Sequence, residues 1–341
     1  MSRQSESARQ GGGNASEEAE PVTAAWAASM LPRRGRGAHK WGVGGVVIVA
    51  GSPLYAGAAA LCAAACGRSG AGIVSAAVPR SIAPVVVGLV PETTIVFLPE
   101  GDSVSVAFRA GEAISERLEQ SRSLIVGPGL GSDDAAVALL RVLFGFIQDR
   151  SGIGFGSSKG TEESDGSGGL IARAAKPVVV DADGLNFLAQ QSNWWERVPA
   201  EFLVLTPHPG EMARLTDQDV SHILEQPLAV ARDAALQWRQ TVVLKGETTL
   251  VASPDGTVRG VETSPALATA GSGDVLSGGI GAFLAQGLAP ADAASLAVYL
   301  GAMAARRLSS ELGVLGVVAG DLPQAIAREI AELEKRGRAD G

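Results

Sequence analysis

The sequence is poor in cysteine, and this shortage excludes a disulfide-stabilised fold. Its two cysteines, Cys62 and Cys66, lie one helical turn apart in an alanine-rich segment. No further Cys or His lies nearby to complete a metal site, so we interpret both as small core-facing residues. The absence of a disulfide framework is consistent with a reducing cytoplasm.

The sequence also lacks a strong basic block and a long apolar run. Its formal net charge is −8, and one short basic cluster covers residues 33–36. This balance disfavours a nucleic-acid partner, so bound phosphates must rely on backbone N–H groups, a metal and a few cations. No apolar run approaches the roughly 20 residues of a membrane span, and the N-terminus lacks a signal-peptide pattern. We therefore expect a soluble cytoplasmic protein that does not contact membranes.

Aromatic residues are scarce at 4%, whereas 46% of the residues are hydrophobic and 44 are glycine. This composition favours an α/β fold with closely packed helices and strands. Residues 1–39 are predicted to be a disordered tail or arm, residues 40–330 one domain, and residues 331–341 a second tail. Within the domain, the Gly- and Ser-rich residues 151–169 are predicted to be a flexible surface insertion.

Apolar runs of strand length alternate with segments of helical periodicity along the chain. Strands are predicted at residues 46–50, 73–78, 94–98, 123–126, 177–180, 202–205, 241–245 and 248–252. Helices are predicted to follow Tyr55 and Asp274 and to cover residues 110–119, 133–146, 185–190, 209–215, 227–239 and 292–308. This alternation predicts a mostly parallel sheet with helices on both faces, in which ligands lie beyond the C-terminal strand ends.

Residues 267–288 (LATAGSGDVLSGGIGAFLAQGL) combine a glycine turn with a buried helix. Gly271 and Gly273 lie where the chain turns into the helix, and their missing side chains let backbone N–H groups approach a ligand. A helix N-terminus carries unpaired donors and partial positive charge, which suit a phosphate. Asp274 beside that phosphate is placed to act as a base toward an attacking hydroxyl. Taken alone, the motif is equally consistent with Asp274 as a helix cap.

Two carboxylates, Asp181 and Asp183, follow another buried strand. On an extended chain they face the same side, where they could approach Mg²⁺ directly or through water, or hold substrate hydroxyls. They are equally suited to cap the helix that begins near Leu185, and the two roles are compatible.

Three more polar or glycine-rich sites follow predicted strands. Residues 127–131 (GPGLG) form a tight turn that either packs a helix or contacts a ligand, and no P-loop pattern follows it. His208 is locked between two prolines, and we favour ligand contact over a packed core histidine. Lys245 follows a buried strand, so its ammonium either meets a phosphate in the crevice or is an exposed hairpin lysine.

Six motifs in a fixed order carry a family resemblance. They are Gly51-Ser-x-x-Tyr-x-Gly-Ala-Ala59, Gly127-Pro-Gly-Leu-Gly131, Asp181-Ala-Asp-x-Leu-Asn186, Thr206-Pro-His-Pro-Gly-Glu211, Leu244-Lys-Gly-x-Thr-Thr249 and Ala268-Thr-x-Gly-Ser-Gly-Asp-Val-Leu276. Together they resemble the NAD(P)H-hydrate dehydratases, members of the ribokinase-like superfamily, over about residues 40–328.

The resemblance implies a ribokinase-like fold and an ADP- or ATP-dependent dehydration of the S form of hydrated NADH or NADPH, with Mg²⁺. It implies that Asp274 is the catalytic base and a substrate contact. The other implied substrate contacts are Ala58, Gly129, Gly131 and His208. The implied nucleotide contacts are Lys245, Gly246, Glu247, Thr248, Thr249, Gly271 and Gly273.

The resemblance also bears on partners. An epimerase often shares a chain with this family, but the tail before Lys40 is expected to be too short to hold one, so a separate epimerase is expected. The resemblance and the apolar helices suggest a homo-oligomer. Ala270 departs from the family, which usually has a second glycine there, and we expect activity to survive the change.

Two alternative functions remain open at this point. The first is an ordinary ribokinase-like kinase of a vitamin alcohol, which would share the fold and the Gly-x-Gly-Asp motif. The second is a nucleotide-binding regulator without catalysis, favoured only by Ala270 and opposed by the intact Asp274 and Lys245. A kinase would make a stable phosphate ester, whereas a dehydratase would regenerate the absorbance of reduced nicotinamide.

Overall fold

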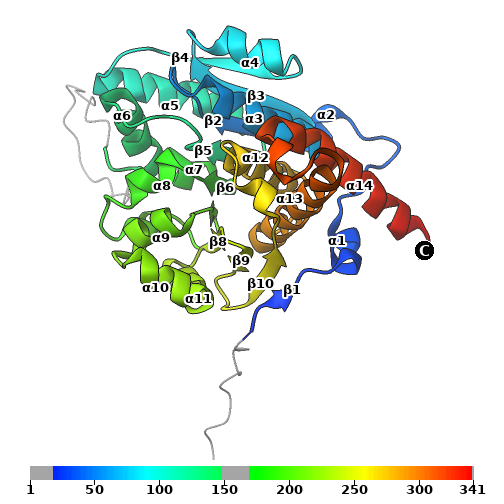
Figure 1. Ribbon diagram of the computed structural model, residues 1–341. Coiled ribbons are helices and arrows are strands. Elements are labelled where there is room, and N and C mark those ends of the chain that lie inside the picture. The colour runs from blue at the N-terminus through cyan, green and yellow to red at the C-terminus, as the bar shows by residue number, and fades with distance from the viewer. Residues whose placement is uncertain (1–17, 148–168, 340–341) are drawn as a thin grey trace, which may run out of the picture.

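A ten-stranded sheet runs through the described part of the chain, and helices cover both of its faces (Figure 1). The computed structural model describes residues 18–147 and 169–339. The strands are β1 (Glu20–Pro21), β2 (Gly45–Val49), β3 (Ile73–Pro79), β4 (Thr94–Leu98), β5 (Ser123–Val126), β6 (Val178–Val180), β7 (Leu203–Leu205), β8 (Thr241–Leu244), β9 (Thr248–Ala252) and β10 (Val258–Glu262). The helices are α1 (Ala24–Met30), α2 (Lys40–Val43), α3 (Ala56–Arg68), α4 (Ala83–Leu89), α5 (Val104–Glu119), α6 (Asp134–Phe144), α7 (Leu170–Ala174), α8 (Asp183–Leu188), α9 (Pro209–Thr216), α10 (Val220–Glu225), α11 (Pro227–Trp238), α12 (Ser272–Ala285), α13 (Pro290–Leu312) and α14 (Leu322–Ala339).

The sheet is mostly parallel, as the alternation of strands and helices predicted. Its strand order is β1-β10-β9-β8-β7-β6-β5-β2-β3-β4. The strands from β8 to β4 in this order run parallel, whereas β8, β9 and β10 are joined as antiparallel neighbours. Because these strands are parallel, the C-terminal ends of β2, β5, β6, β7 and β8 lie at the same end of the sheet. The loops that follow them meet there.

Alternating residues of each strand pack into two hydrophobic cores, one on each face of the sheet. In β2, Val46 and Ile48 pack with α3, α12, α13 and α14, whereas Val47 and Val49 pack with α5, α6 and α8 on the other face. Successive side chains of a strand point to opposite faces, so a strand buried on both sides needs a continuous apolar run. This is why the predicted strands match the observed ones closely.

Helices α3 and α12 pack side by side at very short range (Figure 1). A side chain at Gly278 of α12 would collide with the backbone carbonyl of Cys62 in α3, so glycine is required at this crossing. Cys66 donates its thiol hydrogen to the Gly278 carbonyl at 3.2 Å, and both cysteines are buried and free. The interpretation of the two cysteines as core residues is therefore confirmed.

Both ends of the predicted domain extend further than expected. Residues 20–21 pair with β10, and α1 packs against α13 and α14, so the described part of the predicted tail (residues 18–39) is attached to the domain. Helix α14 continues to Ala339, past the predicted end at residue 330. None of the helices in the described chain is long and apolar enough to cross a membrane.

The predicted insertion at residues 151–169 lies almost entirely outside the described residues. Its flanks are described: Gly145 ends α6, and Gly169 precedes α7. A side chain added to Gly169 would collide with the backbone of Gly145, so these two residues are in direct contact. The two residues that flank this part of the chain, Gly145 and Gly169, therefore lie next to each other.

Candidate active site

The N-terminus of helix α12 presents two backbone N–H groups that have no hydrogen-bond acceptor in the described chain. Gly271 is its N-cap, with φ of 90°, and this left-handed turn favours glycine. The N–H groups of Gly273 and Asp274 donate to no acceptor in residues 18–147 and 169–339. Asp274 lies in the first turn of α12 and is not the N-cap, so the capping alternative for this carboxylate is wrong. The helix start thus offers free donors and one adjacent carboxylate.

The Asp274 carboxylate is an unusual acid. It forms no hydrogen bond or ion pair with the described chain. Burial and, to a smaller extent, the Asp181 carboxylate raise its pKa to about 7, against the opposing effect of the Lys245 ammonium. A carboxyl group with a pKa near neutrality is suited to accept a proton from a hydroxyl.

Asp181 and Lys245 form a buried ion pair beside Asp274. Lys245 Nζ lies 3.1 Å from Asp181 Oδ1 and 3.7 Å from Glu211 Oε2. Ser277 of α12 donates to Asp181 Oδ2 at 2.7 Å. Burial alone would raise the pKa of Asp181, but Lys245 and Ser277 outweigh it and leave that pKa lowered. Asp181 is therefore held as the anion that fixes Lys245 at the helix start.

The expectation that the chain is extended between Asp181 and Asp183 is wrong. Ala182 between them has φ of 46°, so the chain turns at this residue and is not extended. Asp181 faces Lys245, whereas Asp183 accepts a hydrogen bond from the Gly131 backbone N–H at 2.7 Å. The two carboxylates consequently serve different partners.

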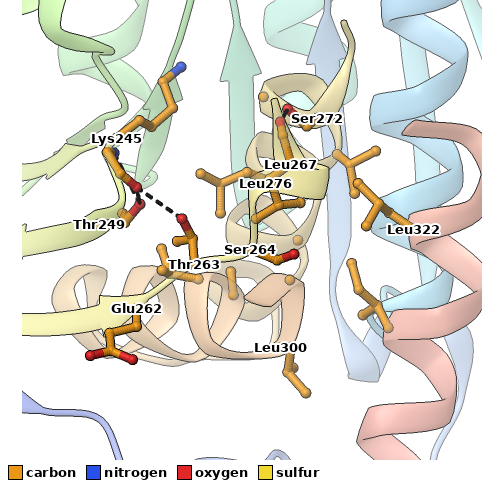
Figure 2. A pocket seen from close by; sticks show the side chains of 18 of the residues that line it. Lys245, Thr249, Glu262, Thr263, Ser264, Leu267, Ser272, Leu276, Leu300 and Leu322 are labelled. Atoms are coloured by element: carbon orange, nitrogen blue, oxygen red, sulfur yellow. Dashed lines mark hydrogen bonds between the residues drawn. The ribbon is translucent and has the colours of Figure 1, made fainter. Parts of the chain in front are cut away.

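A pocket of about 750 Å³ opens beside the start of α12 (Figure 2). Its lining includes six residues that were predicted to contact a nucleotide: Lys245, Gly246, Glu247, Thr248, Thr249 and Gly273. Figure 2 shows Lys245 and Thr249 facing Leu276 of α12 across the pocket, with Leu300 of α13 and Leu322 of α14 beyond it. Gly271, also predicted to contact the nucleotide, does not line this pocket. It forms the turn into α12 instead.

Three of the predicted substrate contacts, Ala58, Gly129 and Gly131, lie close to one another. A side chain at Gly129 would lie 2.7 Å from the Ala58 methyl, so the turn after β5 packs on the first turns of α3. Gly131 is tied to Asp183, whose charge also raises the pKa of Asp274. The structure therefore brings Ala58, Gly129, Gly131 and Asp274 to one end of the sheet.

His208 has a structural role that the sequence analysis did not predict. Its Nδ1 accepts the backbone N–H groups of Gly210 at 3.0 Å and Glu211 at 3.3 Å, so it caps α9. Because Nδ1 is an acceptor, the neutral imidazole carries its proton on Nε2, which lies 3.6 Å from Glu211 Oε1. The side chain is 52% exposed, so His208 is not a packed core histidine.

Several residues that shape the site were not predicted. Glu211 and Ser277 hold Lys245 and Asp181, and the apolar pocket wall comes from Leu276, Leu300 and Leu322. Glu211, Leu276 and Ser277 lay in quoted motifs or stretches but had no site role assigned, whereas Leu300 and Leu322 lay outside them. Ala270 is exposed and has no positive φ, so its methyl group fits without backbone strain.

The described side chains offer little to hold a metal by themselves. No group of three or more His, Cys, Asp or Glu side chains converges on one point in the described ranges, and Asp181 is committed to Lys245. Asp181 and Asp183 nevertheless repel the Asp274 carboxylate, as its raised pKa indicates. A divalent cation carried in by nucleotide phosphates fits this excess of negative charge.

Fold and site together define a ribokinase-like protein with a nucleotide-sized pocket at a Gly-x-Gly-Asp helix start. The Bacillus subtilis ADP/ATP-dependent NAD(P)H-hydrate dehydratase, co-crystallised with ATP and Mg²⁺, superimposes with a TM-score of 0.74 at 24% identity, covering 94% of this chain and all of that one. The family model of the NAD(P)H-hydrate dehydratases matches residues 46–150 and 151–328. The chain belongs to this family.

Two relatives named as NAD(P)H-hydrate repair enzymes or dehydratases support the same family assignment. The bifunctional NAD(P)H-hydrate repair enzyme of Moorella thermoacetica is 38% identical over 317 residues, which are 92% of this chain and 54% of that protein. The ADP-dependent (S)-NAD(P)H-hydrate dehydratase of Neisseria meningitidis serogroup B is 34% identical over 87% of this chain and 88% of its own length. The chain thus spans about half the length of the bifunctional relatives and nearly all of the monofunctional one.

Proposed function

We propose that this chain dehydrates the S form of hydrated NADH or NADPH, with ADP or ATP as the phosphoryl donor and Mg²⁺ as the accompanying cation. The observation that carries the proposal is Asp274, an unpaired and largely buried carboxylate with a pKa of about 7, beside the free donors at the start of α12. Family membership and the adjoining pocket of about 750 Å³ support it.

The site residues fit a reaction that proceeds through a phosphate ester. Hydroxide is a poor leaving group, so the ring hydroxyl first attacks the terminal phosphoryl group while Asp274 takes its proton. The ring nitrogen then expels phosphate, and loss of a proton from the neighbouring carbon restores the dihydronicotinamide. Lys245 and the N–H groups of Gly273 and Asp274 neutralise charge on the transferred group. Bound Mg²⁺ would supply further charge neutralisation at the phosphates.

The two sides of Asp274 fit the two reactants of this reaction. Residues 245–249 and Gly273 line the larger pocket and suit the nucleotide, whereas Ala58, Gly129, Gly131 and His208 suit the hydrated dinucleotide. Asp274, next to Gly273 in the first turn of α12, is proposed to be common to both. Residues Gly271 and Asp181 act on this arrangement indirectly, through the turn into α12 and the position of Lys245.

The direct assay supplies hydrated NADH with ADP or ATP and follows the return of reduced-nicotinamide absorbance. Recovery that depends on the nucleotide supports the proposal. No recovery with either nucleotide, or accumulation of a stable phosphorylated alcohol, would contradict it and favour the kinase alternative.

The pH profile gives an independent check on Asp274. Because its pKa is about 7 and the base must be unprotonated, kcat/KM should rise about tenfold per pH unit below pH 7 and level off above it. An ordinary aspartate would already be ionised at pH 5, and its profile would be flat through pH 7.

Replacing residues 151–168 by a short Gly-Ser linker should leave activity within about twofold of the original. Gly145 and Gly169 are in contact, so closing this gap does not require the domain to move. Steady-state assay and thermal unfolding of the shortened protein measure the effect. A loss of turnover with unchanged thermal stability would instead make the segment part of the active site.

Two partners complete the proposal. An epimerase activity, which would supply the S form, is proposed as a functional partner, because bifunctional NAD(P)H-hydrate repair enzymes are among the relatives of this chain. A cytoplasmic homo-oligomer is proposed because Val85 and Leu89 of α4 and Phe97 of the edge strand β4 are exposed at one edge of the sheet.

A further inference from the structure

A second cavity of about 470 Å³ lies on the substrate side of the site. Gly131, Asp183, Asn186, Gln190, Arg214 and Asp217 contribute to its lining. Helices α8 and α9, which carry Asn186 and Arg214, pack side by side (Figure 1). The cavity shares Gly131 with the residues proposed to contact the hydrated dinucleotide, so it adjoins that region.

Arg214 is held in this cavity by a neutral partner. Its Nε and Nη2 both donate to the amide oxygen of Asn186, at 3.2 and 3.0 Å. No carboxylate lies within ion-pair distance of Arg214 in the described residues. A guanidinium carries five N–H donors, so three remain for a ligand, and no direct ion pair neutralises its charge. An arginine fixed by an amide is suited to bind a phosphate in a defined orientation.

The other cation of the site is already engaged. Lys245 faces Asp181 and Glu211 and borders the nucleotide pocket, and the whole chain has a net charge of −8. A hydrated dinucleotide brings a diphosphate with two negative charges, which this acidic protein must bind with a localised cation. Nη1 of Arg214 lies 4.0 Å from the position of a side chain at Gly210, next to His208. The guanidinium is therefore close to a proposed substrate contact.

The remaining polar groups of the cavity suit the sugar next to a diphosphate. Asp183 and Asp217 are acceptors only, and Asp183 already accepts the Gly131 N–H. Ribose hydroxyls next to the diphosphate can donate to such carboxylates. The cavity thus combines one phosphate-binding donor group with acceptors for neighbouring hydroxyls, which is the pattern of groups along a dinucleotide.

We propose that Arg214, oriented by Asn186, binds the diphosphate of the hydrated dinucleotide and so determines the affinity for that substrate. This role rests on the proposed function, because it assigns a residue to the same substrate. It concerns a binding contact and not the chemical step, so the nucleotide side of the site should not depend on it.

The test compares Arg214→Gln with the original protein on hydrated NADH and hydrated NADPH. We expect KM for both substrates to rise about 10- to 100-fold, with kcat and the KM for ADP within about threefold. Arg214→Lys should recover part of the loss, since a lysine keeps the charge but not the planar donors. Arg109→Gln is the matched control, because Arg109 is an exposed arginine of α5 with no side-chain partner in the described chain. That variant should behave as the original protein.

The outcomes separate this inference from the function on which it rests. Unchanged KM values in Arg214→Gln would overturn it, and a loss confined to hydrated NADPH would move the contact to the 2′-phosphate and also overturn it. A fluorescence titration with NADH, the dehydrated product, needs no turnover. Weaker NADH binding by Arg214→Gln than by Arg109→Gln supports the contact even if the original protein shows no dehydratase activity, and equal binding contradicts it.

Discussion

Asp274→Asn is expected to lower the rate of dehydration by about 10³-fold or more, while the affinity for ADP stays within a few-fold of the original. General base catalysis contributes about 10²- to 10⁴-fold, and asparagine cannot accept the hydroxyl proton. The substitution keeps the size of the side chain and the free N–H groups at the start of α12. Steady-state kinetics and calorimetric titration of ADP measure the two quantities.

Stability provides the control for this variant. The folded pKa of Asp274 is about 7, above its ordinary value of 3.8, so the folded state holds a proton that the unfolded state releases between these two pH values. Stability conferred by protonation is therefore lost as the pH rises from about 4 to 7. Asparagine has no such titration, so Asp274→Asn should be more stable at pH 8 by roughly 2 to 4 kcal/mol.

A stable but inactive Asp274→Asn protein would assign the loss of turnover to chemistry and not to misfolding. Normal turnover in this variant would remove Asp274 from the base role. A lower unfolding temperature than the original at pH 8 would contradict the burial that raises its pKa. The two measurements therefore test the carboxylate from independent directions.

The strands were predicted well because of how a doubly covered parallel sheet is built. A strand such as β2 buries both faces, so it is a continuous apolar run that glycine or proline ends. Strand β10 and helix α14 were not predicted. The β10 sequence, VRGVE, contains glycine and charges, and α14 carries an amphipathic pattern, half of which lies beyond the expected domain end at residue 330.

Candidate site residues could be named from the sequence where a short motif lies directly next to a strand or helix end. They were missed where contacts between distant segments determine their position. Lys245 and Asp274 lie in short motifs next to strand or helix ends, and the structure places both beside one pocket or helix start. The partnership of Asp181 with Lys245 depends on the turn at Ala182, which the alternating pattern of a strand cannot indicate. Leu322 reaches the pocket from a helix 48 positions after Asp274, so no local spacing connects them.

The second large effect is expected for Lys245→Met. Lys245 Nζ lies 3.5 Å from the position of a side chain at Gly273, so its charge is directed at the phosphate site. Removing one preorganised charge or donor at a developing negative charge lowers turnover by about 10²- to 10³-fold. The substitution also leaves Asp181, which is 3% exposed, without its counterion, and breaking such a buried pair costs about 3 to 5 kcal/mol of unfolding free energy.

The pH profile of Lys245→Met distinguishes its electrostatic role from loss of structure. The Lys245 ammonium lowers the pKa of Asp274, so without it that pKa should move above 7, and the rising limb of kcat/KM should shift to higher pH. A merely destabilised protein would lose amplitude without such a shift. Urea unfolding and the pH dependence of kcat/KM measure both effects.

The double variant Lys245→Met with Asp181→Asn separates the structural and functional parts of the ion pair. Asparagine removes the uncompensated charge and keeps a hydrogen-bonding partner for Ser277, so most of the lost stability should return. Turnover should remain low, because the ammonium at the phosphate site is still absent. Recovery of both stability and turnover would reduce Lys245 to a counterion for Asp181. Recovery of stability alone means that the buried aspartate holds Lys245 in place and the lysine acts on the phosphate.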